Sequence, residues 1–442
     1  MDAAVHTGAS PLTSVSELRS FVRQTVEKTP VTDIHTHLYP PDSPQLLFGI
    51  DELLSYHYLI AEALRVSDLP YETFWELPRR KQADFIWATL FVNRSPVSEA
   101  CRGVLTTLAG LGLDVSRRDL EGYRTALADL SITEYVDRVL AVANVRYVVM
   151  TNDPFDPTER AYWLSAGRGA RDPRFLAALR LDPLLLAWPR VVPQLVVAGY
   201  RVRTGETGLD AQTLGEIRRF LADWIERLEP VYLAVSLPPE FAYPDHSGKE
   251  EAIRTQLIEE AVLPSARQYG LPLALMIGVK RQVNPALRVA GDGVGKAAIS
   301  AVEHLCASFP ENKFMVTMLS RENQHELAVV ARKFRNLLPF GCWWFLNNPS
   351  LVTEITRMRM ELLGTSFVPQ HSDARVLDQL IYKWAHARAI IAEVLSHQYE
   401  LLLATGWQPT RSEVERDVEA LLGGYFWEFT GRRPGADRQD AR

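Results

Sequence analysis

The chain has 442 residues, of which 47% are hydrophobic and 23% charged, and its formal net charge is −6. These proportions are those of a folded globular protein, so they favour neither a disordered chain nor a membrane protein. The negative net charge, without long runs of one sign, argues against a nucleic-acid partner, because phosphate binding requires clustered positive charge.

The first residues and the cysteines bear on location. Residues 1–20 lack the basic segment and apolar core of a secretory signal, and no apolar run reaches the roughly 18 residues of a membrane helix. Cys101, Cys306 and Cys342 show no Cys-x-x-Cys spacing, which argues against a disulfide framework and a thiolate zinc site. We therefore expect a cytoplasmic protein without a membrane partner. The sequence leaves homo-oligomerisation open.

The N-terminal segment, residues 1–30, is expected to form a helix over 14–28, where apolar residues recur at helical spacing after a serine cap. This helix leads into Val31-Thr-Asp-Ile-His-Thr-His37, which has the pattern of a short strand. We predict that residues 31–40 contain the first strand of the fold.

The first strand carries two histidines on one face. In a strand alternate side chains share a face, so Asp33, His35 and His37 point the same way. Two neutral imidazoles can bind one metal ion, and a catalytic site usually adds a third protein ligand. A His-x-His pair also arises by chance, but this one ends a strand and precedes two prolines. A loop after a strand is where (β/α)8 barrels carry their chemistry.

From residue 41 to about 140 the pattern is helical almost throughout, most clearly over 50–64. So long a stretch exceeds a simple crossover, and we interpret it as a helical insertion over the active-site face of a barrel. Through 141–375 short β-rich runs alternate with helical spacers, as in parallel α/β proteins. The strands expected after the first are 146–151, 175–180, 231–236, 272–277, 313–318 and 340–345, with 365–373 as the eighth.

These elements predict an α/β fold, a distorted (β/α)8 TIM barrel with a large helical insertion after strand 1. The eighth strand contains a proline, which strands tolerate mainly at edges, starts or bulges. C-terminal helices are expected within residues 376–430, over 376–403 and 411–422. The tail over 431–442, rich in Arg, Asp and Gly, is expected to be disordered.

Barrel closure would place the eighth strand beside the first and bring Asp373 next to the two histidines. Asp373 would then complete a two-His, one-carboxylate metal site, and its carboxylate could also move a proton. Arg375 could bind a substrate carboxylate with its planar fork. The alternative is that Asp373 caps the following helix and Arg375 is solvated.

From about residue 30 to 395 the sequence resembles the uronate isomerase family, a branch of the amidohydrolase superfamily. Asp33-Ile-His-Thr-His37 matches the family's first-strand Asp-x-His-x-His, and Ser372-Asp-Ala-Arg375 matches Thr-Asp-Ser-Arg. The shared order and spacing of the blocks carry the resemblance. Further similar blocks are Ser55-Tyr-His-Tyr58 (Asp-His-Tyr-Lys), Thr151-Asn-Asp-Pro154 (Thr-Asp-Asp-Pro), Leu179-Arg-Leu-Asp182 (Phe-Arg-Pro-Asp) and Trp343-Trp-Phe345 (Trp-Trp-Phe-Asn).

The resemblance implies an enzyme, an aldose–ketose isomerase that converts D-glucuronate to D-fructuronate or D-galacturonate to D-tagaturonate. It also implies one divalent metal ion, zinc in the first place, held by His35, His37 and Asp373. By the same resemblance Tyr58 or Asp373 would move a proton between C2 and C1 through an enediol. The residues expected to bind the sugar acid are His57, Arg180, Arg375 and Trp344.

One position departs from the family pattern. The family has a histidine in its fifth strand, in Leu-His-Ile-Gly, where this chain has Leu275-Met-Ile-Gly278. A thioether neither donates a hydrogen bond nor carries a proton, so the histidine's contribution is lost or comes from another group such as His371. Two alternatives follow: a metal-dependent hydrolase of a sugar-acid lactone or amide, and a sugar-acid binder without turnover.

The glycine-rich segment over 291–296 is similar to a phosphate-binding loop only in composition. No strand leads directly into it, and the Gly-Lys-Ser/Thr ending is absent. We expect it to form a loop over the active site.

Overall fold

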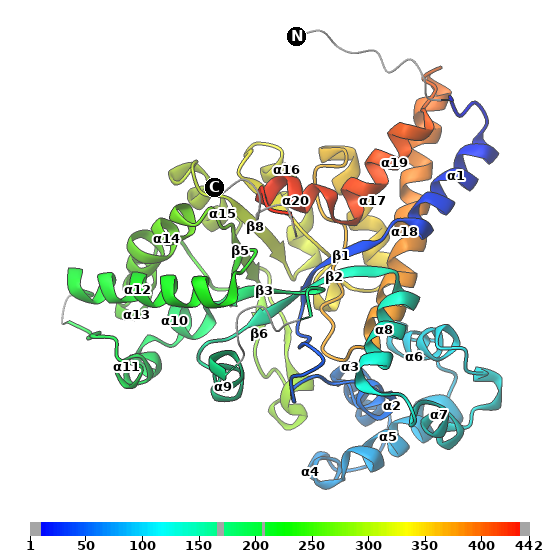
Figure 1. The fold of residues 1–442 in the computed structure, drawn as a ribbon, viewed down its shortest axis with the longest axis horizontal. Helices are drawn as coiled ribbons and strands as arrows, with labels where there is room; N and C mark the ends of the chain where they lie inside the picture. Colours follow the sequence, from blue (N-terminus) through cyan, green and yellow to red (C-terminus); the bar gives the residue numbers. More distant parts are fainter. Residues whose placement is uncertain (1–9, 166–171, 206–207, 434–442) are drawn as a thin grey trace.

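A computed structural model describes residues 10–165, 172–205 and 208–433. Seven strands form one parallel sheet in the order β1-β2-β3-β4-β5-β8-β9, with helices packed around it (Figure 1). Parallel strands in chain order, separated by helices, are the arrangement of a (β/α)8 barrel. The strands are β1 Val31–Thr36, β2 Val145–Asn152, β3 Phe175–Arg180, β4 Leu233–Leu237, β5 Leu273–Ile277, β8 Phe314–Met318 and β9 Leu337–Pro339; β6 Val279–Lys280 and β7 Gly293–Val294 form a separate hairpin.

Residues 366–374 cross the gap between β9 and β1, where the eighth strand is expected, without forming a regular strand. Near β9, the Val368 NH donates to the Pro339 carbonyl over 3.2 Å. Near β1, the Asp373 NH donates to the His35 carbonyl over 3.2 Å. A few backbone hydrogen bonds thus join the two sheet edges, and the predicted distorted barrel is confirmed.

The structure contradicts the strand expected over residues 340–345. The last regular strand ends at Pro339, and one further NH, that of Phe340, still donates to the Val316 carbonyl of β8 over 3.1 Å. Gly341 and Trp344 then adopt positive φ values of 66° and 47°, which turn the chain away from the sheet. The aromatic run has high β propensity, but backbone turns override it, and its side chains cover the end of the strand instead of extending it.

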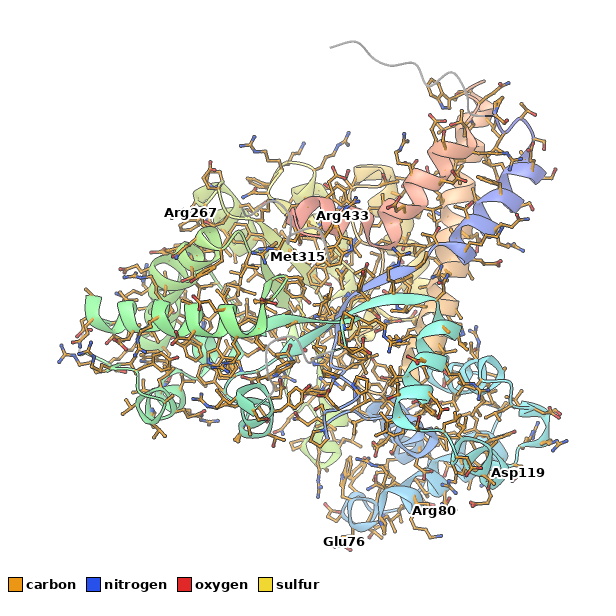
Figure 2. All side chains as sticks on the ribbon, viewed as in Figure 1. Glu76, Arg80, Asp119, Arg267, Met315 and Arg433 are labelled. Atoms are coloured by element: carbon orange, nitrogen blue, oxygen red, sulfur yellow. The ribbon has the colours of Figure 1, made fainter. Side chains whose placement is uncertain are left out.

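The helical insertion lies between β1 and β2 and has its own apolar core, in which Trp87 stacks on Phe91 with ring centroids 4.6 Å apart. Its helices gather on one side of the sheet (Figure 1), and Figure 2 places the exposed Glu76, Arg80 and Asp119 on their outer surface. The last helix packs on β2 and so belongs to the crossover. These helices are α2 Ile50–Leu54, α3 His57–Arg65, α4 Tyr71–Glu76, α5 Arg79–Trp87, α6 Glu99–Gly110, α7 Leu120–Leu127 and α8 Ile132–Ala143.

The helices after β2 surround the barrel (Figure 1). They are α9 Pro157–Ser165, α10 Asp182–Leu186, α11 Trp188–Val197, α12 Ala211–Leu228, α13 Lys249–Leu257, α14 Leu263–Gln268, α15 Ser300–Ser308, α16 Gln324–Ala331 and α17 Pro349–Leu363. Within the described ranges, no helix combines the length and apolar character that crossing a bilayer requires.

The two ends of the chain pack together. Helix α1 (Val15–Lys28) begins at the predicted serine cap and lies along α18 (Gln379–Ala404) (Figure 1). The helix predicted over 411–422 is instead α19 (Arg411–Glu419), followed by a kink and α20 (Tyr425–Thr430).

The kink between α19 and α20 has a packing reason. Gly423 there has a φ of 131°, and a Cβ on it would lie 2.7 Å from the Thr32 side chain. The glycine therefore lets the C-terminal helix approach the start of β1. Of the tail expected to be disordered, residues 434–442 lie outside the described residues.

Candidate active site

Two histidines of the first strand meet a carboxylate from the segment that closes the barrel. His35 Nε2 and His37 Nε2 lie 3.6 and 3.3 Å from Asp373 Oδ1. One ligand atom from each of the three residues lies within 4.8 Å of the other two, and all three side chains are largely buried. The predicted juxtaposition of Asp373 with the two histidines is therefore present, and Asp373 does not cap the following helix, whose first residue is Gln379.

Hydrogen bonds on the far side of each imidazole fix its tautomer. His35 Nδ1 lies 3.2 Å from the Tyr232 hydroxyl, which donates its own proton to the Ile34 carbonyl over 2.7 Å. His37 Nδ1 lies 2.9 Å from the Thr151 hydroxyl, which likewise donates to a β1 carbonyl over 3.1 Å. Since each hydroxyl proton is already used, each imidazole must donate from Nδ1. Both Nε2 lone pairs are left facing Asp373, as in metal sites oriented by outer hydrogen bonds.

The chemical state of the three groups suits a cation. Burial lowers the pKa of His37 to about 4 and that of His35 well below its ordinary value, so both are neutral at pH 7. Burial alone would raise the pKa of Asp373, but its electrostatic interactions with the imidazoles of His37, His35 and His371 outweigh burial, hold the pKa below its ordinary value and keep the carboxyl ionised. His35 Nε2 and Asp373 Oδ1 are buried without a hydrogen-bond partner. These residues therefore fit a bound metal ion.

Asp373 is held in a backbone conformation that non-glycine residues rarely adopt, with a φ of 53°. The preceding residue anchors it, because the Ser372 NH donates to Asp33 Oδ1 over 3.1 Å. A second contact fixes that carboxylate, since Trp384 Nε1 of α18 donates to Asp33 Oδ2 over 2.8 Å. Asp33 thus supports the ligand loop and is not itself in the ligand set.

The helical insertion brings two further predicted residues to the site entrance. His57 and Tyr58, at the start of α3, have ring centroids 4.5 Å apart, and the Trp344 ring lies 5.6 Å from that of His57. Burial lowers the pKa of His57 to about 3 and raises that of Tyr58 well above its ordinary value, so both are neutral at pH 7. Tyr58 is therefore suited to donate a proton rather than to accept one.

The entrance is a cavity of about 320 Å³, a size suited to a small molecule. The exposed Arg375 lies at this entrance beside His57 and Trp344. The segment after β5 covers it, since Trp75 Nε1 of α4 donates to the Ala286 carbonyl over 2.9 Å. The remaining lining residues are Glu52, Ser55, Tyr56, Ile60, Trp75, Arg79, Arg281, Val289, Asp292 and Val376.

Arg180 is committed to another partner. Its guanidinium forms an ion pair with Asp182, which also accepts a hydrogen bond from the Ser236 NH over 2.8 Å. Arg180 lies close enough to influence the pKa of His37, and because Asp182 pairs with its Nε and Nη2 atoms, its Nη1 donors remain available to a ligand.

Sequence reasoning missed several residues around the site. Tyr232 orients His35, yet it precedes β4 and carries no motif, so only barrel geometry reveals it. His371 is the substitute that the sequence suggests for the missing histidine. It is fully buried, both of its ring nitrogens lack a hydrogen-bond partner, and its ring centroid lies 5.1 Å from that of His35. Met276, where the family has that histidine, is buried in the apolar interior of the barrel. Lys383, buried on α18, also escaped notice.

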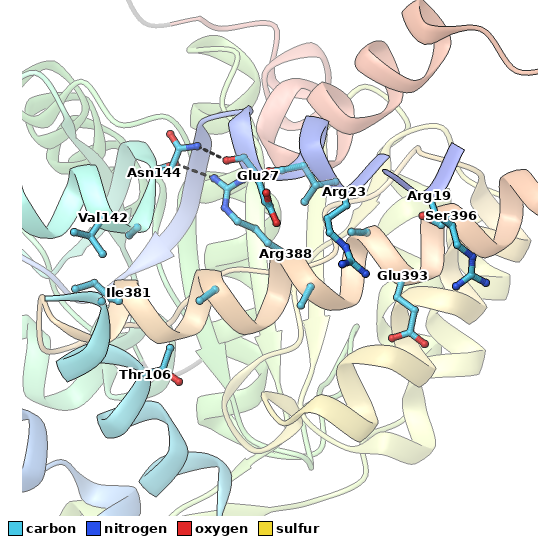
Figure 3. Close-up of a pocket in the computed structure, with 16 residues that line it drawn as sticks. Arg19, Arg23, Glu27, Thr106, Val142, Asn144, Ile381, Arg388, Glu393 and Ser396 are labelled. Carbon is cyan, nitrogen blue, oxygen red and sulfur yellow. Dashed lines mark hydrogen bonds between the residues drawn. The ribbon is translucent and has the colours of Figure 1, made fainter. Parts of the chain in front are cut away.

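A larger cavity of about 790 Å³ lies elsewhere, between α1, α6, α8 and α18 (Figure 3). Its buried cation, Arg388, donates to the Val26 and Asn144 carbonyls and so ties helix ends together. Arg19 at its rim pairs with Glu400. The entrance cavity is lined by His57, Trp344 and Arg375, whereas this larger cavity is lined by none of the predicted metal-binding or substrate-binding residues and is separate from the chemistry described above.

A parallel, distorted (β/α)8 barrel with two histidines ending its first strand and an aspartate on the closing segment defines a barrel protein of the amidohydrolase superfamily. The chain is similar to a uronate isomerase from Bacillus halodurans C-125, with 54% sequence identity over 96% of this chain and 98% of that one, and a TM-score of 0.92. The chain belongs to the uronate isomerase family.

Two more distant structures share the fold. A uronate isomerase from Thermotoga maritima aligns with 15% identity over 97% of this chain and 100% of that one, with a TM-score of 0.75. A glucuronate isomerase from Caulobacter crescentus aligns with 16% identity over 98% of each chain, with a TM-score of 0.77. No family model matches the chain, and a search of curated proteins finds no match.

Proposed function

We propose that this protein is a uronate isomerase that converts D-glucuronate to D-fructuronate, D-galacturonate to D-tagaturonate, or both. The observation that carries the proposal is the 54% identity to the Bacillus halodurans uronate isomerase over nearly the whole chain. The His35, His37 and Asp373 cluster supports it, because a site of this kind suits a substrate rich in oxygen donors. A cytoplasmic location is part of the same proposal, supported by three free, buried cysteines.

The proposed metal is one divalent ion, with zinc first to be tested, held by His35, His37 and Asp373. Neutral imidazoles and a carboxylate are ligands that zinc accepts readily. When bound, the ion would act as a Lewis acid on a substrate oxygen.

Two side chains divide the proton transfers in this proposal. Asp373, an ionised carboxylate, removes the proton from C2 of the open-chain sugar acid, and the electron pair forms the C1=C2 bond of an enediol. Tyr58, a neutral phenol, donates a proton to O1 and recovers one from O2. The proton on Asp373 exchanges with solvent while the enediol is bound, and Asp373 then protonates C1 as the C2 carbonyl forms. The directions of their pKa shifts give the starting protonation states that this division needs, an ionised carboxylate and a neutral phenol at pH 7.

The remaining residues would position the sugar acid. Arg375 presents a planar, exposed guanidinium at the cavity entrance, where it could bind the substrate carboxylate. His57 and Trp344 would line the path inward. Arg180 would contact the sugar acid through Nη1, while its Nε and Nη2 atoms keep the ion pair with Asp182.

The experiment is an assay of metal-analysed protein with both uronates in heavy water, followed by NMR. We expect ketose formation with deuterium entering at the exchanging carbon, and loss of metal and turnover in Asp373→Asn. Full activity and retained metal in that variant would contradict the assignment of Asp373.

The burial of Met276 where the family has a histidine keeps a second function open, a hydrolase of a sugar-acid lactone or amide. In that reaction Asp373 would accept a proton from the attacking water. Consumption of such a substrate, without aldose–ketose interconversion, would favour it.

A further inference from the structure

Lys383 is a buried cation that no described residue neutralises directly. It lies near the start of α18 and is only 4% exposed. Its Nζ atom lies 5.3 Å from the centre of the Tyr58 ring and 5.2 Å from that of Tyr382. Across the described ranges, its ammonium forms no ion pair within 4.0 Å and no hydrogen bond with another residue. Two aromatic faces are therefore its nearest identified partners.

A second lysine, Lys313, provides a comparison, because its ammonium lies near an aromatic ring and also has a hydrogen-bond acceptor. Lys313 Nζ lies 5.7 Å from the Phe429 ring, but it also donates to the Phe429 carbonyl over 2.7 Å. It precedes β8 and packs on the C-terminal helix, at the end of the strands opposite the candidate metal ligands. Lys383 lacks such an acceptor, although burying an unpaired charge is costly and aromatic rings offset only part of that cost.

Lys383 remains charged under working conditions. Burial lowers its pKa to about 8, while the carboxylates of Asp373, Glu99 and Asp33 act in the opposite direction. The ammonium form therefore predominates at pH 7. Titratable groups that face it, or whose pKa it influences, come from several elements: Asp33 of β1, His57 and Tyr58 of α3, Glu99 of α6, Tyr382 of α18, and His371 and Asp373 of the closing segment.

We propose that Lys383 is a catalytic residue whose ammonium stabilises the negative charge that develops on the substrate oxygens in the enediolate. The proposal rests on the function proposed above, in which Tyr58 serves the same C1–C2 region. Arg375, a planar fork at the entrance, is the better partner for a fixed carboxylate, whereas Lys383 is a compact charge beside Tyr58. A cation that interacts with negative charge present only in the transition state and the enediolate accelerates the reaction without tightening substrate binding.

The test compares Lys383→Met, Lys383→Arg and the control Lys313→Met, each checked for folding by circular dichroism. Lys383→Met should lower kcat by about 10²–10³-fold, the usual loss for one oxyanion donor, with KM nearly unchanged. Lys383→Arg should recover part of kcat, and Lys313→Met should match the wild type. If Lys383→Met does not fold, Lys383→Gln replaces it in every comparison.

Binding of two analogues separates charge stabilisation from a structural role. A sugar acid that keeps its carboxylate and carries a hydroxamate in place of C1 and C2 imitates the planar enediolate, whereas the sugar acid reduced at C1 imitates only the ground state. Lys383→Met should weaken the hydroxamate by about the same 10²–10³-fold factor and leave the reduced acid unaffected.

Each other outcome overturns the proposal in a distinguishable way. Equal weakening of both analogues with a raised KM would make Lys383 a carboxylate-binding residue, and unchanged kcat would exclude it from the reaction. If wild-type protein turns over neither uronate, the proposed function itself fails, and the role of Lys383 fails with it.

Discussion

The carboxylate of Asp33 accepts a 2.8 Å hydrogen bond from the indole of Trp384 and thereby joins the first strand of the barrel to helix α18. Its other oxygen accepts from the Ser372 NH and supports the loop in which Asp373 adopts a φ of 53°. The aspartate of the Asp-x-His-x-His motif therefore acts on the site through a ligand that lies far away in sequence. Its contribution to stability should depend on pH.

At neutral pH Asp33 is ionised, although burial destabilises the charged form of its carboxyl group. Burial raises its pKa from 3.8 to about 6, and the hydrogen bonds that it accepts only partly oppose this shift. A carboxyl with a raised native pKa stabilises the fold below its unfolded pKa, and this stabilisation is lost as pH rises through the native pKa. At about 1.4 kcal/mol per pKa unit, the full loss from well below pH 3.8 to well above pH 6 is roughly 3 kcal/mol, of which about 2 kcal/mol falls between pH 4 and pH 6.

Asparagine at position 33 does not titrate, so the free energy of unfolding of Asp33→Asn should fall furthest below that of the wild type at pH 4, and this difference should narrow towards pH 7 as Asp33 ionises in the wild type. Urea unfolding at several pH values measures this. The control is Asp210→Asn, because the wild-type Asp210 carboxylate caps α12 and has a pKa of about 2. The difference in free energy of unfolding between this variant and the wild type should therefore change little between pH 4 and pH 7. A gap for Asp33→Asn that widens with pH would show that our burial argument is wrong.

The hydroxyls behind the two histidines should control metal affinity. Tyr232→Phe removes the acceptor for His35 Nδ1, and Thr151→Val removes that for His37 Nδ1. Each change should weaken metal binding by about 10–100-fold, the usual effect of losing such an outer partner. Competition with a chromophoric chelator measures the affinity.

Tyr243→Phe is the matched control for these two variants, since its hydroxyl donates to Glu259, away from the candidate ligands. Its metal affinity should equal that of the wild type. Unchanged affinity in both Tyr232→Phe and Thr151→Val would mean that the ion is held by other atoms.

The parts of the fold that sequence predicted well are those set by local pattern. A short, continuously apolar run between helical spacers placed β3 at its observed bounds, and the serine cap placed the start of α1. The pairing of His35 with Asp373 was also predictable, because it needs only barrel closure and the position of each residue at a strand end.

What sequence could not supply are contacts that arise from backbone turns and distant packing. The run over 340–345 was wrongly predicted as a strand because β propensity does not register the positive φ at Gly341 and Trp344. Tyr232 and Lys383 reach the site from elements without a motif. Arg180, assigned by family resemblance, is held by Asp182 through a contact that only the folded geometry shows.

Metal binding should stabilise the folded protein, because the unfolded chain does not hold the three ligands together. A ligand at one hundred times its Kd adds about 2.7 kcal/mol to the free energy of unfolding. We expect zinc to raise the Tm of chelator-treated wild-type protein and to leave Asp373→Asn unaffected, as followed by calorimetry. Asp378→Asn, which alters a buried carboxylate outside the ligand set, should keep the response. A response in Asp373→Asn equal to that of the wild type would rule out the proposed ligand set.

Gly341 should be indispensable for the conformation of the closing segment. Its φ is 66°, and a Cβ placed on it would lie 1.8 Å from Nδ1 of His371, which is fully buried. Gly341→Ala therefore combines left-handed backbone strain of about 1–2 kcal/mol with overpacking of about 1–3 kcal/mol. Because His371 lies two residues before Asp373, relieving the clash should also displace the metal ligand and weaken metal binding.

Gly270→Ala isolates the backbone contribution, since Gly270 has a φ of 62° and no atom within 4 Å of the position that a Cβ would take. It should show only the strain of about 1–2 kcal/mol and normal metal affinity. Urea unfolding and chelator competition on both variants measure the difference. If Gly341→Ala matched Gly270→Ala in both measurements, His371 would have room to move without carrying Asp373, and the closing segment would be more tolerant than its packing indicates. If only Gly341→Ala loses metal affinity, the packing of His371 against Gly341 holds the third ligand in place.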